Sequence, residues 1–338
     1  MGAVIRAIST YLPSRKLTNA QLAEEYQDWG VDKIFEKTGI SERRIAEPGE
    51  CASDLGVAAA EKLFARGACA PEAIDFLLFC TQTPDYLLPA TACLVQDRLG
   101  LRTSCGALDF SLGCSGYVYG LALAKALIEK GMADHVLLIN ADTYTKFLNP
   151  TDRGVRTIFG DGAAATLIAA DPGHEAAIGP FVFGTDGRGA DKLIVPAGCS
   201  RLRPSPATAV EKDDGTGVFR SAENLYMDGP EIFNFSLRAV PQVVGQLLEK
   251  TRMTPEEVDH FVFHQANRFM LEQLRRKIKI PAEKFWINMD SYGNTVAATI
   301  PMALEIALGQ KLIKPGDRVM LVGFGVGYSW AAAMATIV

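Results

Sequence analysis

The chain has 338 residues, of which 48% are hydrophobic and 22% charged, and its formal net charge is −5. This composition is typical of a globular protein with a large core, and it excludes a disordered or fibrous chain. The net negative charge offers no general attraction for nucleic acid or for an anionic membrane. No segment reaches the ~18 consecutive apolar residues that a membrane-spanning helix needs.

Seven cysteines are scattered along the chain without Cys-x-x-Cys spacing. We therefore expect neither a disulfide framework nor a metal site, and a reducing cytoplasm is the expected location. The N-terminus shows no long apolar run before a cleavage site, so a signal peptide is not predicted.

Short hydrophobic runs alternate with longer helical patterns along the chain. Strands are predicted for 74–79, 135–139, 164–168, 260–263 and 319–322, and helices for 53–66, 115–130, 230–250 and 299–308. Strands separated by helices predict parallel sheets that are covered on both faces.

The sequence repeats itself at an offset of about half its length. Residues 71–80 read PEAIDFLLFC and residues 255–264 read PEEVDHFVFH, an offset of 255 − 71 = 184. Residues 134–138 (DHVLL) match 317–321 (DRVML) at 317 − 134 = 183. We therefore predict two similar α/β halves, 1–172 and 173–338, because the period is far too long for a solenoid.

The stretch 184–224 interrupts the second half and is rich in Gly, Pro, Asp and Arg. A loop of this length in a compact domain is usually a functional lid or a mobile segment. We predict an excursion from the sheet here.

Cys114 is the first candidate for chemistry. It follows an apolar strand end and precedes a helix, in the sequence DFSLGCSGY. Free N–H groups and the helix dipole at such a position stabilise a thiolate. The alternative is an inert buried cysteine in a tight strand-to-helix turn.

His264 and Asn294 are further candidates in the second half. His264 ends a predicted strand, where α/β sheets place their ligands, and Asn294 lies in a Gly-Asn-Thr loop before a helix. Taken singly, His264 is as well explained as a hydrogen-bonded core histidine, and Asn294 as an N-cap or turn asparagine. The glycines at 323–327 do not indicate NAD binding, because no helix or downstream acidic residue follows them.

Taken together, the motifs resemble the 3-oxoacyl-acyl-carrier-protein synthase III family, from about Ile5 to Val338. The matching segments are Thr38-Gly39-Ile40-Ser41-Glu42-Arg43, Gly113-Cys114-Ser115-Gly116, Pro150-Thr151-Asp152-Arg153-Gly154, Phe159-Gly160-Asp161-Gly162, His264-Gln265-Ala266-Asn267, Gly293-Asn294-Thr295 and Phe324-Gly325-Val326-Gly327-Tyr328-Ser329-Trp330. The resemblance implies a duplicated thiolase fold with five layers, α-β-α-β-α, and a homodimer.

The resemblance also implies a reaction, the first condensation of fatty acid synthesis. Cys114 would take an acyl group from acyl-CoA, and His264 and Asn294 would stabilise the enolate that malonyl-acyl-carrier-protein forms as CO2 leaves. Attack of this carbanion on acyl-Cys114 would give 3-oxoacyl-acyl-carrier-protein, with no metal or other cofactor. The second oxyanion hole would use the N–H of Cys114 and one near Gly327, with Gly293 supporting the Asn294 loop.

The same resemblance assigns binding residues. Those expected to contact the acyl-CoA are Leu87, Leu88, Val326, Lys37, Arg153 and Asn267. Leu87 and Leu88 belong to a segment that, in the family, reaches across the dimer into the partner's acyl tunnel. An acidic carrier protein is expected to dock on Arg268, Arg275, Arg276 and Lys277, with Arg268 and Arg275 on one helix face.

Several positions depart from the family pattern and leave alternatives open. Lys33 stands where a Trp is common, Val326 replaces a Gly, and Arg268-Phe269 replaces Leu-Arg or Arg-Arg. One alternative is therefore a specialised member with a non-standard primer or acceptor, in surface-polysaccharide or secondary metabolism. Another is a non-catalytic subunit that binds carrier protein. A degradative thiolase is rejected, because Cys199 is the one cysteine after Cys114 and it lies in the excursion.

Overall fold

The computed structural model describes residues 2–26, 28–174 and 177–338, and it is built on two five-stranded sheets. The first has the order β1 (Gly2–Tyr11), β7 (Gly162–Asp171), β6 (His135–Asp142), β4 (Phe76–Cys80) and β5 (Gly106–Phe110). The second has the order β14 (Phe285–Trp286), β13 (His260–Phe263), β15 (Arg318–Gly325), β16 (Ser329–Thr336) and β8 (Ile178–Thr185).

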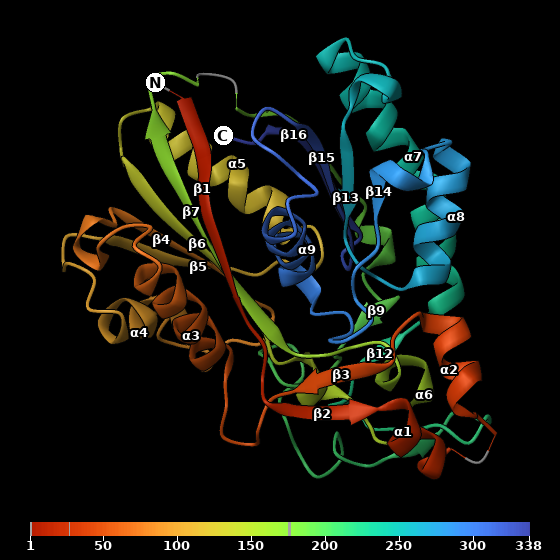
Figure 1. Ribbon diagram of the computed structural model, residues 1–338. Helices are drawn as coiled ribbons and strands as arrows, with labels where there is room; N and C mark the ends of the chain where they lie inside the picture. The colour runs from red at the N-terminus through yellow and green to blue at the C-terminus, as the bar shows by residue number, and fades with distance from the viewer. Residues whose placement is uncertain (1, 27, 175–176) are drawn as a thin grey trace.

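Helices fill three layers around these sheets (Figure 1). Helices α3 (Ala52–Ala65) and α4 (Thr91–Arg98) cover the outer face of the first sheet, and α7 (Gly229–Thr251) and α8 (Arg268–Ile278) cover the second. Between the sheets lie α5 (Gly116–Glu129) and α9 (Thr299–Gly309), which contact both. The five-layered α-β-α-β-α thiolase fold predicted from the resemblance is confirmed.

Helix α5 shows why the sequence builds a central layer. Its sequence GYVYGLALAKALIE is apolar around most of its circumference, and such a helix is stable only when it is buried on several sides. Val118, Leu121 and Ile128 have at most 1% of their surface exposed, in a core that also contains residues of both sheets.

The two sheets repeat the same pattern of strand directions. Strand β4 pairs in parallel with β5 and β6, and β6 pairs antiparallel with β7. Strand β13 likewise pairs in parallel with β14 and β15, and β15 pairs antiparallel with β16. The segments that repeat in sequence therefore hold equivalent places. The boundary between residues 172 and 173 stays a prediction, and residues 175–176 of the join lie outside the described part of the chain.

The expectation of purely parallel sheets is wrong, because both sheets are mixed. The chain leaves β15 and returns as β16 after residues 326–328. So short a connection joins antiparallel neighbours, whereas a parallel neighbour requires a crossover of a dozen or more residues.

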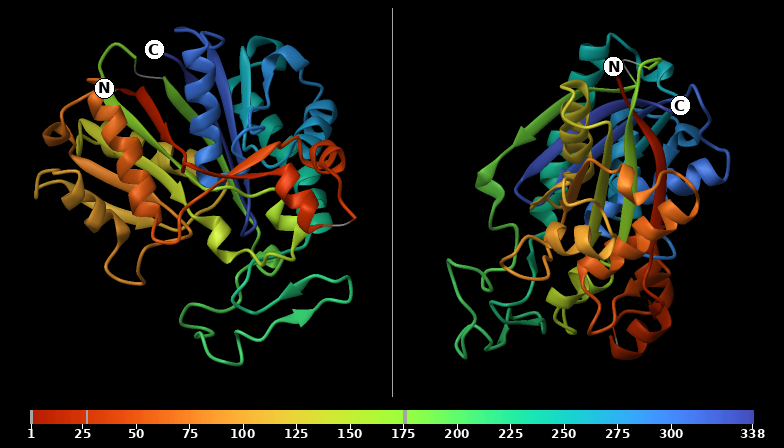
Figure 2. Two further views of the ribbon diagram at one scale, coloured as in Figure 1. Left: turned by 60° about the horizontal axis from the view of Figure 1, so that its bottom comes forward. Right: turned by 90° about the vertical axis from the view of Figure 1, so that its left-hand side faces the viewer.

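Six short strands and three short helices of the described residues complete the fold around one end of the sheets. They are β2 (Arg15–Thr18), β3 (Glu42–Ile45), β10 (Lys212–Asp213), β11 (Phe219–Arg220) and the β9 (Leu193–Ile194) and β12 (Tyr226–Met227) pair, with α1 (Asn19–Glu25), α2 (Val31–Thr38) and α6 (Arg153–Arg156). Residues 195–225, which we call the arm, leave the body between β9 and β12 and extend away from it (Figure 2).

The arm is more ordered than the loop that the sequence predicts. Strands β10 and β11 pair with each other. Arg220 of β11 donates to Asp152 at 2.5 Å, and the N–H of Phe219 donates to Thr151 at 2.9 Å. These contacts hold the arm against the segment before α6.

Burial of α5 predicts a large effect of truncating one of its side chains. Leu121→Ala removes a side chain with 0% exposure, and we expect it to lower the free energy of unfolding by about 2–5 kcal/mol. Met132→Ala is the control. Met132 lies two residues beyond Lys130, the C-cap of α5, and its side chain is 63% exposed. Its truncation should change the free energy of unfolding by less than ~0.5 kcal/mol. Urea unfolding of both variants measures the difference, and equal effects would contradict the central role of α5.

Candidate active site

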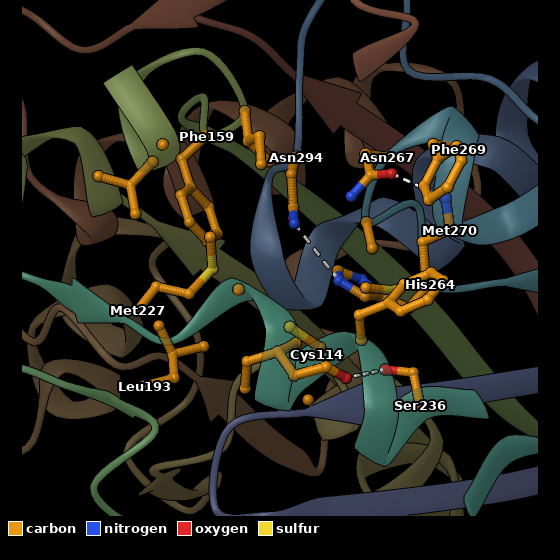
Figure 3. Close-up of a pocket in the computed structure, with 18 of the residues that line it drawn as sticks. Cys114, Phe159, Leu193, Met227, Ser236, His264, Asn267, Phe269, Met270 and Asn294 are labelled. Atoms are coloured by element: carbon orange, nitrogen blue, oxygen red, sulfur yellow. Dashed lines mark hydrogen bonds between the residues drawn. The ribbon is translucent and has the colours of Figure 1, made fainter. Parts of the chain in front are cut away.

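Three loops bring Cys114, His264 and Asn294 to one pocket of about 770 Å³ (Figure 3). Cys114 lies between β5 and α5, His264 directly follows β13, and Asn294 precedes α9. All three are buried, with 6%, 2% and 3% of their surfaces exposed. Two halves of the chain therefore contribute to one site.

The sulfur of Cys114 lies against the end of β15. A Cβ atom on Gly325 would lie 2.8 Å from this sulfur, and one on Gly323 would lie 2.7 Å from the Cys114 carbonyl oxygen. Contacts this short are not tolerated by real Cβ atoms, so glycine is required at both positions. The N–H groups of Cys114 itself and of Val326 act on the sulfur and lower its pKa.

These donors do not outweigh the loss of water. Burial raises the pKa of Cys114 to about 12, because the charged form of a buried thiol is disfavoured. The thiolate expected from the nearby helix N-terminus is therefore not the resting form, and the expectation is corrected in this respect.

His264 is held by Thr299, a residue that the sequence analysis did not single out. The Nδ1 atom of His264 lies 2.8 Å from Thr299 Oγ1, and its Nε2 atom lies 3.4 Å from Asn294 Nδ2. Burial lowers the pKa of His264 to about 3. The imidazole is therefore neutral throughout the physiological range.

The side-chain amide of Asn294 has a fixed orientation. Its Oδ1 accepts from the N–H of Val296 at 2.9 Å, which leaves Nδ2 toward His264. The backbone is pinned as well, since the N–H of Asn294 donates to Ile158 at 2.9 Å. Gly293 has φ +80°, and a Cβ there would lie 2.9 Å from the carbonyl oxygen of Ile158.

The pocket around these groups is mostly apolar. Its apolar walls come from α7, α8, the segment after α6 and the base of the arm, through Phe233, Met270, Phe159, Leu193 and Met227. These residues look like ordinary core positions in the sequence, so no sequence signal marked them. Ser236 of α7 was also missed, although a polar residue on an apolar helix face is a usable signal.

Lys37 and Asn267, predicted to bind substrate, line the same pocket. Asn267 also caps α8, because its side chain accepts from the N–H of Met270 at 2.8 Å. Arg153 lies nearby, and Lys33, Lys37 and Arg153 lie 5.6, 4.5 and 5.9 Å from the centre of the Trp29 ring. Three cations therefore surround one indole beside the pocket.

Other predicted residues lie apart from this pocket. Leu87 and Leu88 are 75% and 82% exposed and do not line it, so their proposed role depends on a second chain. An N–H near Gly327 was expected to serve the oxyanion, and the loop N–H that acts on the sulfur is that of the preceding residue, Val326. The side chain of Val326 packs toward Gly113.

The cations of α8 are not equivalent. Arg268 and Lys277 are exposed, and the Arg276 side chain is 68% exposed. Arg275, in contrast, is partly buried, and it donates to Glu272 at 2.9 Å and to the carbonyl of Ile280 at 3.1 Å. Arg275 is therefore occupied by contacts near the end of α8, whereas Arg268, Arg276 and Lys277 are open to solvent, and the docking surface stays a prediction.

In the described ranges, no cluster of three His, Cys, Asp or Glu side chains is suited to a metal ion. Within the same ranges, no helix combines the length and apolar character needed to span a membrane.

Comparison with known proteins gives consistent matches. The family model described as 3-oxoacyl-[acyl-carrier-protein] synthase III matches residues 108–187, and the model of its C-terminal part matches residues 248–337. A β-ketoacyl-[acyl-carrier-protein] synthase III of Caldanaerobacter subterraneus is 38% identical over 334 residues, which cover 99% of this chain and 97% of that protein.

Solved structures agree with these matches. A crystal structure of a 3-oxoacyl-(acyl-carrier-protein) synthase III is 53% identical, with a TM-score of 0.98 and full coverage of both chains. A 3-oxoacyl-(acyl-carrier-protein) synthase from Burkholderia xenovorans is 40% identical, with a TM-score of 0.90 and coverage of 100% of this chain and 94% of that one.

The raised pKa of Cys114 predicts how its reactivity depends on pH. The thiolate fraction of a group with pKa about 12 rises about tenfold per pH unit up to pH 9. The rate of Cys114 alkylation by iodoacetamide should rise in the same proportion between pH 7 and 9. Peptide mass spectrometry measures this rate, and the exposed Cys199 provides a comparison peptide in each digest. A plateau within this range would indicate a stabilised thiolate instead.

Proposed function

We propose how Cys114, His264 and Asn294 divide one reaction, on the premise that the chain belongs to the 3-oxoacyl-[acyl-carrier-protein] synthase III family. It is an acyltransferase that condenses an acyl-CoA with malonyl-acyl-carrier-protein, giving 3-oxoacyl-acyl-carrier-protein, CoA and CO2 in the initiation of fatty acid synthesis. The alternative of a non-catalytic subunit is thereby set aside. The observation that carries the division of roles is the His264–Asn294 pair, 3.4 Å apart in the pocket that holds Cys114.

Cys114 performs the first half-reaction. Its sulfur attacks the carbonyl carbon of the acyl-CoA, the bond from that carbon to the CoA sulfur breaks, and the proton of the thiol leaves with CoA. The oxyanion formed on the way is held by the N–H groups of Cys114 and Val326, both of which face the sulfur. Preorganised donors of this kind act strongly in a site without water.

His264 and Asn294 perform the second half-reaction. The Nε2–H of His264 and the Nδ2 group of Asn294 donate to the thioester oxygen of the malonyl group. The bond to its carboxylate breaks, CO2 leaves, and the electron pair forms the enolate. The enolate carbon then attacks acyl-Cys114, and the sulfur departs as a thiolate that takes up one proton from solvent. A proton on Nε2 requires that Thr299 donates to Nδ1, for which the distance is 2.8 Å.

The CoA portion lies toward the cations beside the pocket. Lys33, Lys37 and Arg153 gather around Trp29, and clustered cations suit the phosphates of CoA. The apolar walls around Cys114 suit a neutral acyl primer, because a charged group would lose its hydration there. The two thioesters and these side chains account for every bond change, so we propose that no cofactor takes part.

The carrier protein docks on the exposed cations of α8, namely Arg268, Arg276 and Lys277. This helix begins at the pocket, where Phe269 and Met270 are part of the lining. Charge complementarity with an acidic partner raises the rate of encounter and fixes orientation.

We also propose that the protein is a homodimer and that it is located in the cytoplasm. Tyr86, Leu87 and Leu88 form an apolar segment that is 61–82% exposed, and a contiguous apolar surface usually marks an interface. All seven cysteines are free, as a reducing compartment requires.

The roles of the three residues predict separable defects. Cys114→Ser should lower acyl loading from acyl-CoA at least ~10²-fold, while malonyl decarboxylation continues. His264→Ala or Asn294→Ala should lower decarboxylation about 10²–10³-fold and leave loading within a few-fold. Intact-protein mass spectrometry with a panel of neutral acyl-CoAs measures loading, and CO2 release measures decarboxylation. Loading on another cysteine in Cys114→Ser would refute the assignment.

The docking proposal predicts a defect that is confined to one substrate. The double change Arg276→Glu and Lys277→Glu should raise the KM for malonyl-acyl-carrier-protein about tenfold, and added salt should reduce the difference. The KM for acyl-CoA should not change. Lys130→Glu with Lys314→Glu, two exposed lysines outside α8, controls for net charge. Equal effects of the two double variants would remove α8 from the docking surface.

A further inference from the structure

Asp142 is a buried carboxyl group to which the reaction above assigns no role. It is the last residue of β6, its exposure is 0%, and it lies in the first half of the chain. Strand β6 ends beside a short turn of the second half, residues 296–298, which lies between Asn294 and α9. We call this segment the 296–298 turn.

One oxygen of Asp142 is fully engaged with the first half. Its Oδ1 accepts from the N–H of Gln82 at 2.8 Å and from the hydroxyl of Thr81 at 3.3 Å. The side chain of Gln82 in turn accepts from the hydroxyl of Tyr144 at 2.8 Å. These contacts fix the direction in which the carboxyl group points.

The end of β6 that carries Asp142 lies beside the other half. A Cβ atom on Gly162, which pairs with Asp142 across β6 and β7, would lie 3.2 Å from Thr295, the residue before the 296–298 turn. Oδ2 of Asp142 has no side-chain or backbone partner at ordinary hydrogen-bond distance among the described residues. The N–H of Ala297 is nevertheless close enough to lower the pKa of Asp142, against the larger effect of burial, which raises it to about 7. Ala297 is therefore the group of the second half that acts on this carboxyl.

The 296–298 turn needs such an anchor because its backbone is strained. Val296 has φ +56°, a left-handed conformation that is unfavourable for a β-branched residue. Residues hold such conformations only when their surroundings fix them, most often at functional sites.

Both donors of the decarboxylation step depend on this turn. The N–H of Val296 donates to Oδ1 of Asn294 at 2.9 Å and so orients the amide. Thr299 directly follows the turn, and its hydroxyl lies 2.8 Å from Nδ1 of His264. A shift of the turn would therefore displace Asn294 and His264 together.

We propose that Asp142 is a positioning residue: its Oδ2 accepts from the N–H of Ala297, holds the 296–298 turn, and so aims Asn294 and His264 at the malonyl thioester. This inference rests on the proposed roles of those two residues. Under this proposal a residue of the first half other than Cys114 contributes to malonyl decarboxylation, the step whose two donors both belong to the second half.

Asp142→Asn tests the inference with almost no change of shape. Its Oδ1 keeps the contacts to Gln82 and Thr81, but an NH2 group replaces the acceptor that faces Ala297. We expect malonyl decarboxylation to fall at least tenfold, whereas acyl loading on Cys114 from acetyl-CoA should not fall, because the charge of Asp142 raises the pKa of Cys114 and its removal favours the thiolate. Loading, measured by intact-protein mass spectrometry, also reports that the variant is folded. An equal fall in both steps, or no fall in decarboxylation, would overturn the proposal.

Asp75→Asn is the control. Asp75 accepts from the N–H groups of Asp134 at 2.9 Å and His135 at 3.0 Å, at the opposite end of β6 from the 296–298 turn. It should leave the ratio of decarboxylation to loading unchanged, and a ratio altered as in Asp142→Asn would count against the inference. His264→Ala and Asn294→Ala run in parallel, because normal decarboxylation in these variants would refute the proposed function itself.

Val296→Gly provides a second, independent test. Glycine adopts φ +56° without strain, so the turn should need its anchor less, and Val296→Gly should restore part of the decarboxylation lost in Asp142→Asn. Strictly additive losses would contradict the coupling. If Asp142→Asn fails to fold in both backgrounds, Asp142 serves the core and not the site, and the proposal falls.

Discussion

The exclusion of water from the pocket determines the protonation state of each reactive group in it. Cys114 rests as a thiol because burial raises its pKa to about 12, and His264 rests as a neutral imidazole because burial lowers its pKa to about 3. Burial therefore keeps both groups uncharged well beyond the pH at which an exposed cysteine or histidine would titrate. A neutral imidazole is nevertheless suited to donate one hydrogen bond to an enolate oxygen. The cost is that the thiol must lose its proton during acyl transfer itself.

Duplication of the fold explains how these groups meet. The nucleophile follows the edge strand β5 of the first sheet, whereas His264 follows β13, the counterpart of β4 in the second. The apolar layer of α5 and α9 fixes the two sheets back to back. Their reactive ends therefore face a common pocket, which the helices α2, α6, α7 and α8 and the base of the arm complete. Polar contacts also cross the join, as between the hydroxyls of Ser115 and Ser329 at 2.7 Å and from the N–H of Gly160 to the carbonyl of Asn294 at 3.0 Å.

The sequence was informative where local chemistry is unusual. The repeat at 183–184 residues locates equivalent strands, and the motifs around Cys114, His264 and Asn294 identify residues that the fold brings into one pocket. The pocket walls could not be predicted, because Phe159 and Met227 are indistinguishable from core residues until the helices are placed. The protonation of Cys114 depends on burial by distant segments. The ion pair of Arg275 was predictable from the sequence, because Glu272 lies three residues earlier on the same helix.

The two glycines of β15 beside Cys114 limit which mutations could make this enzyme resistant to a covalent inhibitor. An organism usually evades such a compound by enlarging a side chain next to the warhead. At positions 323 and 325 any side chain would collide with the carbonyl or the sulfur of Cys114 itself, so the change that blocks the drug would also displace the nucleophile. Resistance is therefore directed to side chains elsewhere in the pocket lining, such as Leu193 and Met227 at the base of the arm.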